Sequence, residues 1–199
     1  MNTIIYDIEI AKAIPSKSEP KEEGVEYCKG WGDHAGMGIA CLCAYDYRED
    51  RYRVFTESNR KELGKLIDGA DLIVGFNSIN FDNRVLSAVW GVDASKRNNY
   101  DILRGIWAAV ALVGGARGGY GLDACCAANF GTKKSGNGAM APVDWQRGKI
   151  GDVIDYCLQD VRLTKMLFDE ICLHGSIRSP KDAHKTIEVK RPFHPLETS

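Results

Sequence analysis

The heptapeptide IIYDIEI, residues 4–10, is typical of a buried β-strand, because four of its seven residues are isoleucine. Side chains two apart on a strand point to the same face, so Asp7 and Glu9 lie side by side on a strand that we expect to be central. Burying two unpaired carboxylates is costly, and a pair of hard divalent cations held by carboxylate oxygens is the simplest compensation. The alternative is a strand end whose acids face water.

Length and composition describe an ordinary globular domain. The 199 residues fit one sizeable domain, with 44% apolar and 27% charged residues. The formal net charge of -1 excludes a protein that binds polyanions through an overall basic surface. Any contact with nucleic acid therefore needs a local basic patch. No apolar stretch reaches transmembrane length and the N-terminus lacks the signal-peptide pattern, so no membrane is expected.

The seven cysteines are an odd number and contain no C-x-x-C pair. Zinc-finger spacing is therefore absent. Cys41 and Cys43 alternate along a strand-like run, and Cys125 and Cys126 are adjacent. The pattern favours buried free thiols in a reducing cytoplasm over a disulfide framework.

The first half of the chain predicts a mixed sheet. Apolar runs at 38–47 and 51–56 flank a turn at 48–50, and with the first strand they form an antiparallel meander. Asn59 opens a helix with a capping box, and the apolar strand at 71–76 that follows this helix is expected to lie parallel to the first. The result is an α/β fold with helices on the faces of one mixed sheet.

The second half predicts helices and glycine-rich loops. We expect helices at 81–90, 102–113 (with Asp101 as N-cap), 122–129 and 152–172. Long loops are expected at 12–33, 114–121 and 131–142. One domain would span residues 1–174, followed by a polar tail at 175–199 that packs loosely or is disordered.

Two further acidic segments affect the interpretation of Asp7 and Glu9. Asp82 follows the strand at 71–76, at the edge where α/β ligand sites gather, although a first-turn helix acid needs no function. Tyr156 and Asp160 are four apart on the last helix and share a face, which could equally be a solvated face.

Taken together, these segments resemble the DEDD superfamily of 3′→5′ exonucleases. Tyr6-Asp7-Ile8-Glu9 matches the first motif, Asn77 with Phe81-Asp82 the second, and Tyr156 with Asp160 the Y-x-x-x-D of the DEDDy branch. The chain is most similar in these motifs to the proofreading exonuclease domains of family B DNA polymerases and their stand-alone relatives. The resemblance implies a ribonuclease H-like fold with a mixed five-stranded sheet.

The resemblance also implies a two-metal site with Mg²⁺ or Mn²⁺. Asp7 would bridge both ions, Glu9 and Asp160 would complete the site of the ion that activates water, and Asp82 would act through the water shell of the second ion. Tyr156 would orient the attacking water, alongside or in place of a general base. An all-oxygen ligand set suits these hard cations rather than zinc.

Substrate contacts are expected from a wider set. Asn77 either holds the terminal nucleotide, orients Asp82 or caps the helix that follows. Phe81 is either a stacking residue or core, and Arg117 sits in a glycine-rich loop that lets a backbone approach a phosphate. Further candidates for stacking are Trp31 and Met37, and for phosphate contact Arg84, Lys133, Lys134 and Arg162.

The sequence therefore predicts a 3′→5′ exonuclease that releases nucleoside 5′-monophosphates from single-stranded DNA or RNA 3′ ends. A catalytically silent nucleic-acid-binding module is the alternative, and an acidic Ca²⁺-binding protein lacks the D-x-D-x-D-G loop. No tethering domain accompanies the site within the 199 residues, so the chain acts alone or with a protein partner.

Overall fold

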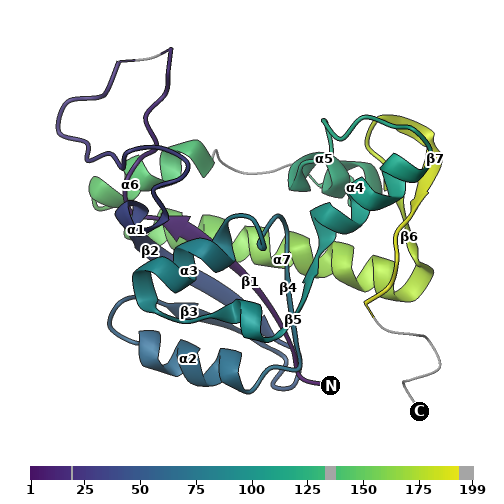
Figure 1. The fold of residues 1–199 in the computed structure, drawn as a ribbon, viewed down its shortest axis with the longest axis horizontal. Coiled ribbons are helices and arrows are strands. Elements are labelled where there is room, and N and C mark those ends of the chain that lie inside the picture. The colour runs from purple at the N-terminus through teal and green to yellow at the C-terminus, as the bar shows by residue number, and fades with distance from the viewer. Residues whose placement is uncertain (19, 133–137, 193–199) are drawn as a thin grey trace.

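The computed structural model describes residues 1–18, 20–132 and 138–192. Its centre is a five-stranded sheet of order β3-β2-β1-β4-β5 (Figure 1). β1, β2 and β3 are antiparallel neighbours, whereas β4 and β5 run parallel to β1. The predicted α/β, ribonuclease H-like mixed sheet is confirmed. The strands are β1 (Thr3–Ile10), β2 (Ile39–Asp46), β3 (Arg51–Phe55), β4 (Leu72–Gly75) and β5 (Asn98–Asp101).

The predicted helices lie close to their expected ranges, and the longest, α7, runs along most of the width of the molecule (Figure 1). The α-helices are α1 (His34–Met37), α2 (Arg60–Asp68), α3 (Asp82–Trp90), α4 (Ile102–Leu112), α5 (Leu122–Phe130), α6 (Ala141–Gln146) and α7 (Ile150–His174). Two short 3₁₀ turns, η1 (Ala94–Lys96) and η2 (Gly138–Met140), complete the set.

The sheet separates two hydrophobic cores. Ile4 and Tyr6 of β1 pack into the core beneath α2 and α3, whereas Ile5 packs into the core that includes α4, α5 and α7. This alternation follows from the two-residue period of a strand. Because Asp7 and Glu9 share the parity of Ile5, they belong to the α7 face of the sheet.

β1 is longer than its parallel neighbour. The pairing of β1 with β4 joins only Thr3–Ile5 to Leu72–Val74, and β4 ends at Gly75. The chain then turns sharply, since a Cβ at Gly75 would lie 2.5 Å from the Cβ of Ser78. The acidic part of β1 therefore extends beyond the end of β4, where a sheet of equal strands would have paired it.

The expectation of a loosely packed tail is wrong for its described part. Residues after Gly175 form the hairpin β6 (Ser176–Ser179) and β7 (Asp182–Glu188), which packs against α4, α5 and α7. Ile177, Ile187 and Val189 are buried there. The segment has few apolar residues, but alternation directs them to one face. The prediction of a domain end at residue 174 stays a prediction.

Other local predictions also need correction. The short strand β5 and helix α6 were not predicted, because NNYD and APVDWQ are too short to show a period. Asn59 does not cap α2: its side chain accepts from the Thr56 N–H and donates to the Val54 carbonyl. Asp101 is the N-cap of α4, as predicted.

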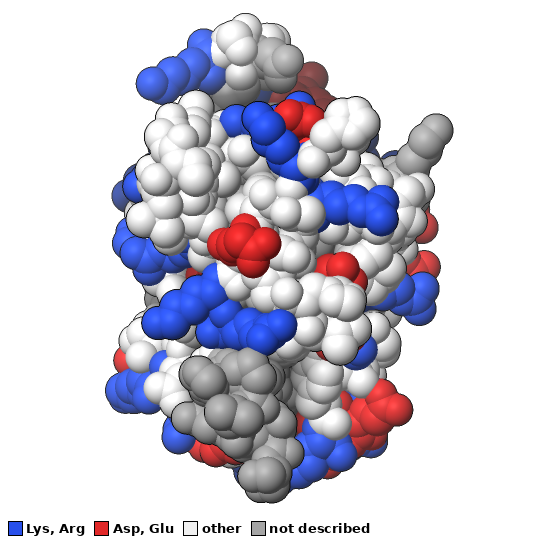
Figure 2. Space-filling view, turned by 90° about the vertical axis from the view of Figure 1, so that its right-hand side faces the viewer, with Lys and Arg blue, Asp and Glu red and all other residues white. Residues whose placement is uncertain are grey.

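All seven cysteines are free thiols, and all but Cys172 are buried. Among the described residues, no helix is both long and apolar enough to cross a bilayer. Lysine, arginine and acidic side chains are interspersed on the face drawn in Figure 2, in keeping with the near-zero net charge.

Candidate active site

Three carboxylates converge on the α7 face of β1. One oxygen from each of Asp7, Glu9 and Asp160 lies within 4.8 Å of the others, and Glu9 and Asp160 are both 7% exposed. The pairing of α7 against β1 brings Asp160 to the two strand acids from far along the chain. Like charges in a buried site repel one another, so a cation bound between them is strongly favoured. A donor set of carboxylate oxygens alone fits Mg²⁺ or Mn²⁺.

Asp82 lies beside this group but has a different local environment. Its carboxylate accepts the Ile8 N–H at 3.1 Å, at a position where β4 has already ended and offers no strand partner. Burial raises the pKa of Asp82 to about 7, and the negative charges of Asp101 and Asp160 add to the shift against the hydrogen bonds of its own and the Ile8 N–H. Asp82 is thus attached to β1 between the two strand acids.

A cluster of thiols supports Asp7 from inside the core. The Cys157 Sγ donates to the Asp7 carbonyl at 3.4 Å and lies 3.7 Å from its carboxylate Oδ2. Burial raises the pKa of the Cys157 thiol, which keeps it a neutral donor. The sulfur atoms of Cys41, Cys43 and Cys157 lie within 4.8 Å of one another. Sequence reasoning missed Cys157, because only the packing of α7 brings it to the two strand cysteines.

Tyr156 is half-buried, one helical turn before Asp160. Its hydroxyl faces η2: a Cβ at Gly138 would lie only 2.9 Å from the hydroxyl oxygen. The absence of a side chain at Gly138 therefore leaves room for the tyrosine. Gly138 also lines the pocket next to Glu9.

A pocket of about 410 Å³ opens beside Glu9. Trp31 and Phe81 form one part of its wall, with ring centroids 6.0 Å apart and planes at 62°. Trp31 is 72% exposed although it lines the pocket. The remaining wall comes from the end of β1, the start of the 12–33 loop, η2 and the first turn of α6, through Ile8, Ile10, Ile14, Pro15, Ser16, Gly138, Ala139 and Pro142.

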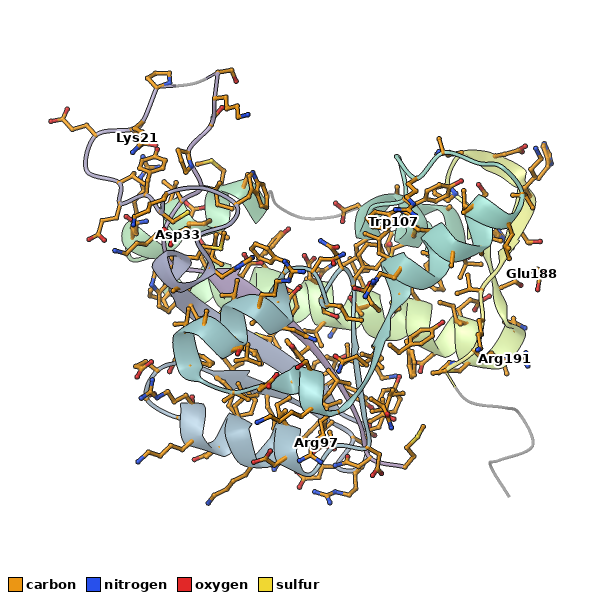
Figure 3. All side chains as sticks on the ribbon, viewed as in Figure 1. Lys21, Asp33, Arg97, Trp107, Glu188 and Arg191 are labelled. Carbon is orange, nitrogen blue, oxygen red and sulfur yellow. The ribbon has the colours of Figure 1, made fainter. Side chains whose placement is uncertain are left out.

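The long loop after β1, predicted at 12–33, folds back over the strand end. The Lys12 N–H donates to the Met37 carbonyl at 2.9 Å, and residues 13 and 27 form a bridge. Figure 3 shows the loop rising above the sheet, with Asp33 near its base and Lys21 farther out. Met37 is fully buried in the core beneath α3, so its interpretation as a stacking residue is wrong.

Asn77 has an unusual backbone. Its φ of +64° is in the left-handed region, and its N–H donates to Asp101 at 3.0 Å. The Asn80 side chain approaches the Asn77 Oδ1 at 3.4 Å. The N-cap of α3 is Phe81, so Asn77 does not cap that helix.

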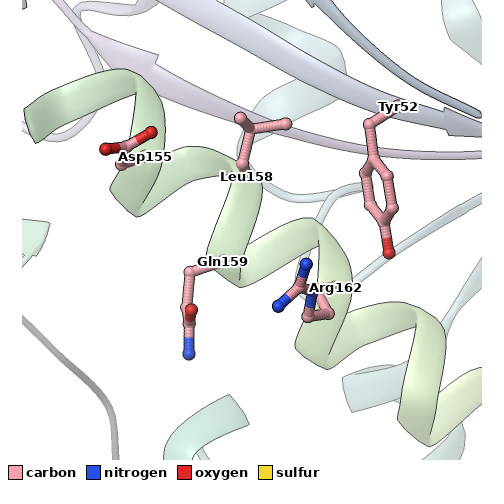
Figure 4. A pocket seen from close by; sticks show the side chains of 5 residues that line it. All are labelled: Tyr52, Asp155, Leu158, Gln159 and Arg162. Atoms are coloured by element: carbon pink, nitrogen blue, oxygen red, sulfur yellow. The ribbon is translucent and has the colours of Figure 1, made fainter. Parts of the chain in front are cut away.

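The basic candidates are spread over the molecule. Arg117 lies 5.6 Å from the Trp107 ring, whose indole donates to the Arg117 carbonyl, and Figure 3 places Trp107 on α4. Arg162 borders a separate pocket of about 320 Å³ on the outer face of α7, together with Asp155 and Tyr52 (Figure 4). Arg84 is exposed on α3. Lys133 and Lys134 lie outside the described residues.

The fold and the acidic group thus define an α/β protein of ribonuclease H-like architecture with a carboxylate site near the carboxyl end of its central strand. Among solved structures, it is similar to a family B DNA polymerase from the hyperthermophilic archaeon Pyrobaculum calidifontis, with a TM-score of 0.60 and 17% identity. The match covers 85% of this chain and 24% of the polymerase, so the chain spans about a quarter of that protein's length. No known family profile matches the sequence, and no curated protein matches it.

Proposed function

We propose that this protein is a metal-dependent 3′→5′ exonuclease of the DEDDy type, acting on single-stranded DNA or RNA. The observation that carries the proposal is the convergence of Asp7, Glu9 and Asp160 within 4.8 Å. These residues would hold the cations, and Asp82 would contribute through water. The cations would supply charge stabilisation for the attacking and leaving oxygens of a phosphodiester.

Three features of the chain would support the reaction. The hydroxyl of Tyr156 would orient a water molecule at the edge of the acidic group, where Gly138 leaves room for the tyrosine. The Cys157 thiol would hold the Asp7 main chain in place. The Ile8 N–H would fix the carboxylate of Asp82. These contacts pre-arrange the carboxylates before any substrate binds, which is how such sites gain rate.

The pocket beside Glu9 is the proposed site of the terminal nucleotide. Its volume of about 410 Å³ suits a single nucleotide rather than a base pair, and Trp31 and Phe81 offer aromatic surface to a base. Stacking tolerates every base, so the enzyme would show little sequence preference. An unpaired 3′ end would reach the carboxylates, whereas a paired end would first have to separate.

The test uses 5′-labelled single-stranded DNA and RNA oligomers with Mg²⁺, Mn²⁺ or EDTA. We expect a ladder that shortens from the 3′ end and disappears with EDTA. The Asp7→Ala variant should abolish it, whereas Asp155→Ala, a matched change on the outer face of α7, should not. The released product should be a nucleoside 5′-monophosphate.

Two results would reject the proposal. Cleavage that is independent of metal, or equally fast in Asp7→Ala, would show that the acidic group is not the catalytic site. Metal-dependent binding of single strands with no cleavage of any substrate would favour the silent nucleic-acid-binding module.

A further inference from the structure

Asp101 does more than cap a helix. It is 4% exposed, at the junction of β5 and α4, and its carboxylate accepts three backbone N–H groups. Capping α4 uses one of them, the Arg104 N–H at 3.2 Å. The other two belong to Asn77 at 3.0 Å and Ile79 at 3.1 Å, both in the loop between β4 and α3. Two of its three bonds thus hold a different segment.

That loop needs restraint. Asn77 has a φ of +64°, a left-handed conformation that is strained for a residue other than glycine. The turn is also tight, with no space for a Cβ at Gly75. Hydrogen bonds to a buried carboxylate are charge-assisted. The two bonds that Asp101 accepts from the loop are therefore stronger than bonds to a neutral acceptor. The loop conformation therefore depends on a residue outside the loop.

The loop leads directly to two residues of the candidate active site. Phe81 lines the pocket beside Glu9, and Asp82 accepts the Ile8 N–H between the two strand acids. A shift of the loop would move both at once. The Ile8 N–H would then lose its acceptor, although Ile8 is distant from Asp101 in sequence.

We propose that Asp101 is a positioning residue, which fixes the β4–α3 loop so that Phe81 and Asp82 meet the acidic group. The effect on catalysis rests on the proposed exonuclease function, whereas the effect on the loop and on Ile8 does not. Asp101 itself contacts the loop backbone.

The central variant is Asp101→Ser. Serine is a good N-cap, so α4 keeps its cap while the loop loses its two bonds. The matched control is Asp93→Ser, which makes the same change at the N-cap of η1, where Asp93 accepts the Ser95 N–H at 3.1 Å. Asp101→Asn is a second variant that keeps one acceptor oxygen, in case the serine variant does not fold.

The first readout is amide hydrogen exchange and needs no substrate. In Asp101→Ser, we expect exchange at residues 77–82 and at the Ile8 amide to be roughly tenfold faster, with α4 unchanged. Asp93→Ser should leave all of these amides unchanged. If Asp101 only capped α4, serine would replace that cap, and exchange at residues 77–82 and at the Ile8 amide would stay as in the wild type, which would overturn the proposal.

The second readout is cleavage of the labelled single strand by the folded variants. For Asp101→Ser we expect kcat about 10²-fold lower, since a misplacement of order 1 Å has such an effect, and we expect Asp101→Asn to lie between it and the wild type. Unchanged kcat with faster exchange at Ile8 would reject the positioning role. If the wild type cleaves nothing, the exonuclease proposal fails, and the exchange result still decides whether Asp101 positions the loop.

Discussion

Two sets of acids lie near the carboxyl ends of the parallel strands β1, β4 and β5, and they differ in what surrounds them. The oxygens of Asp7, Glu9 and Asp160 converge on one another. Asp82 and Asp101 accept backbone N–H groups from β1, the β4–α3 loop and α4. The same residue type therefore has two different surroundings: the carboxylates that face each other would hold the proposed cation, and the carboxylates that face N–H groups fix the backbone around them.

The largest expected effect is the loss of a converging carboxylate. Asp160→Asn should lower the cleavage rate by about 10³-fold, equivalent to about 4 kcal/mol of barrier, because the site loses one charged ligand. It should also abolish the stabilisation of the fold by Mn²⁺, measured as a shift in Tm. Asp155→Asn, on the outer face of the same helix, should change neither. If Mn²⁺ raised the Tm of Asp160→Asn as much as that of the wild type, the two sets of acids would not differ in metal binding.

The next effect concerns the pH dependence of stability due to Asp82, whose carboxylate accepts the Ile8 N–H. The pKa of Asp82 in the folded protein is about 7, above its ordinary value of 3.8, so between these values the folded state binds more protons than the unfolded state. Its contribution to stability is thus most favourable below pH 3.8 and is lost as the pH rises through 7. The total is a few kcal/mol at most, at about 1.4 kcal/mol per pH unit.

Urea unfolding at pH 5 and pH 8 without divalent cations measures how much stability Asp82 contributes at each pH. The wild type should lose more stability over that interval than Asp82→Asn, and Mn²⁺ at pH 8 should restore part of the loss to the wild type. An equal loss in both proteins would mean that another group carries the pH dependence.

A smaller effect is expected from the tyrosine beside the converging set. Tyr156→Phe should slow cleavage roughly 10- to 100-fold without weakening Mn²⁺ binding, because it removes one hydroxyl that orients water while the carboxylates remain. Kinetics at saturating Mn²⁺, together with a metal titration, separate the effect on cleavage from any effect on Mn²⁺ binding. Complete loss of cleavage with intact fold and metal binding would contradict this assisting role.

The smallest effect concerns the pocket rather than the acids. Trp31→Ala should raise KM for a single strand about tenfold, the scale of one lost base stack, and leave kcat nearly unchanged. Because Trp31 is 72% exposed, thermal stability should hardly change. Tyr52→Ala, at the separate pocket by α7, is the control. A fall in kcat with constant KM would place Trp31 in the chemistry instead of in binding.

Much of the candidate site could be read from local patterns. The alternation in IIYDIEI placed Asp7 and Glu9 on one face, and the four-residue spacing placed Tyr156 with Asp160, since each depends only on the period of its own element. Prediction failed where local period was uninformative. Met37 was a candidate for stacking by its residue type but is buried in the core, and the tail after Gly175 has few apolar residues but buries those it has.

By itself, the sequence determined the first four strands, the main helices and the acids on them, because side-chain period and capping are properties of neighbouring residues. Only the tertiary structure decided which acids meet. The packing of α7 on β1 brings Asp160 and Cys157 to Asp7, and the early end of β4 frees the Ile8 N–H for Asp82. Asp101 reaches the loop of Asn77 for the same reason. These contacts depend on the relative lengths and packing of distant elements, which no local pattern encodes.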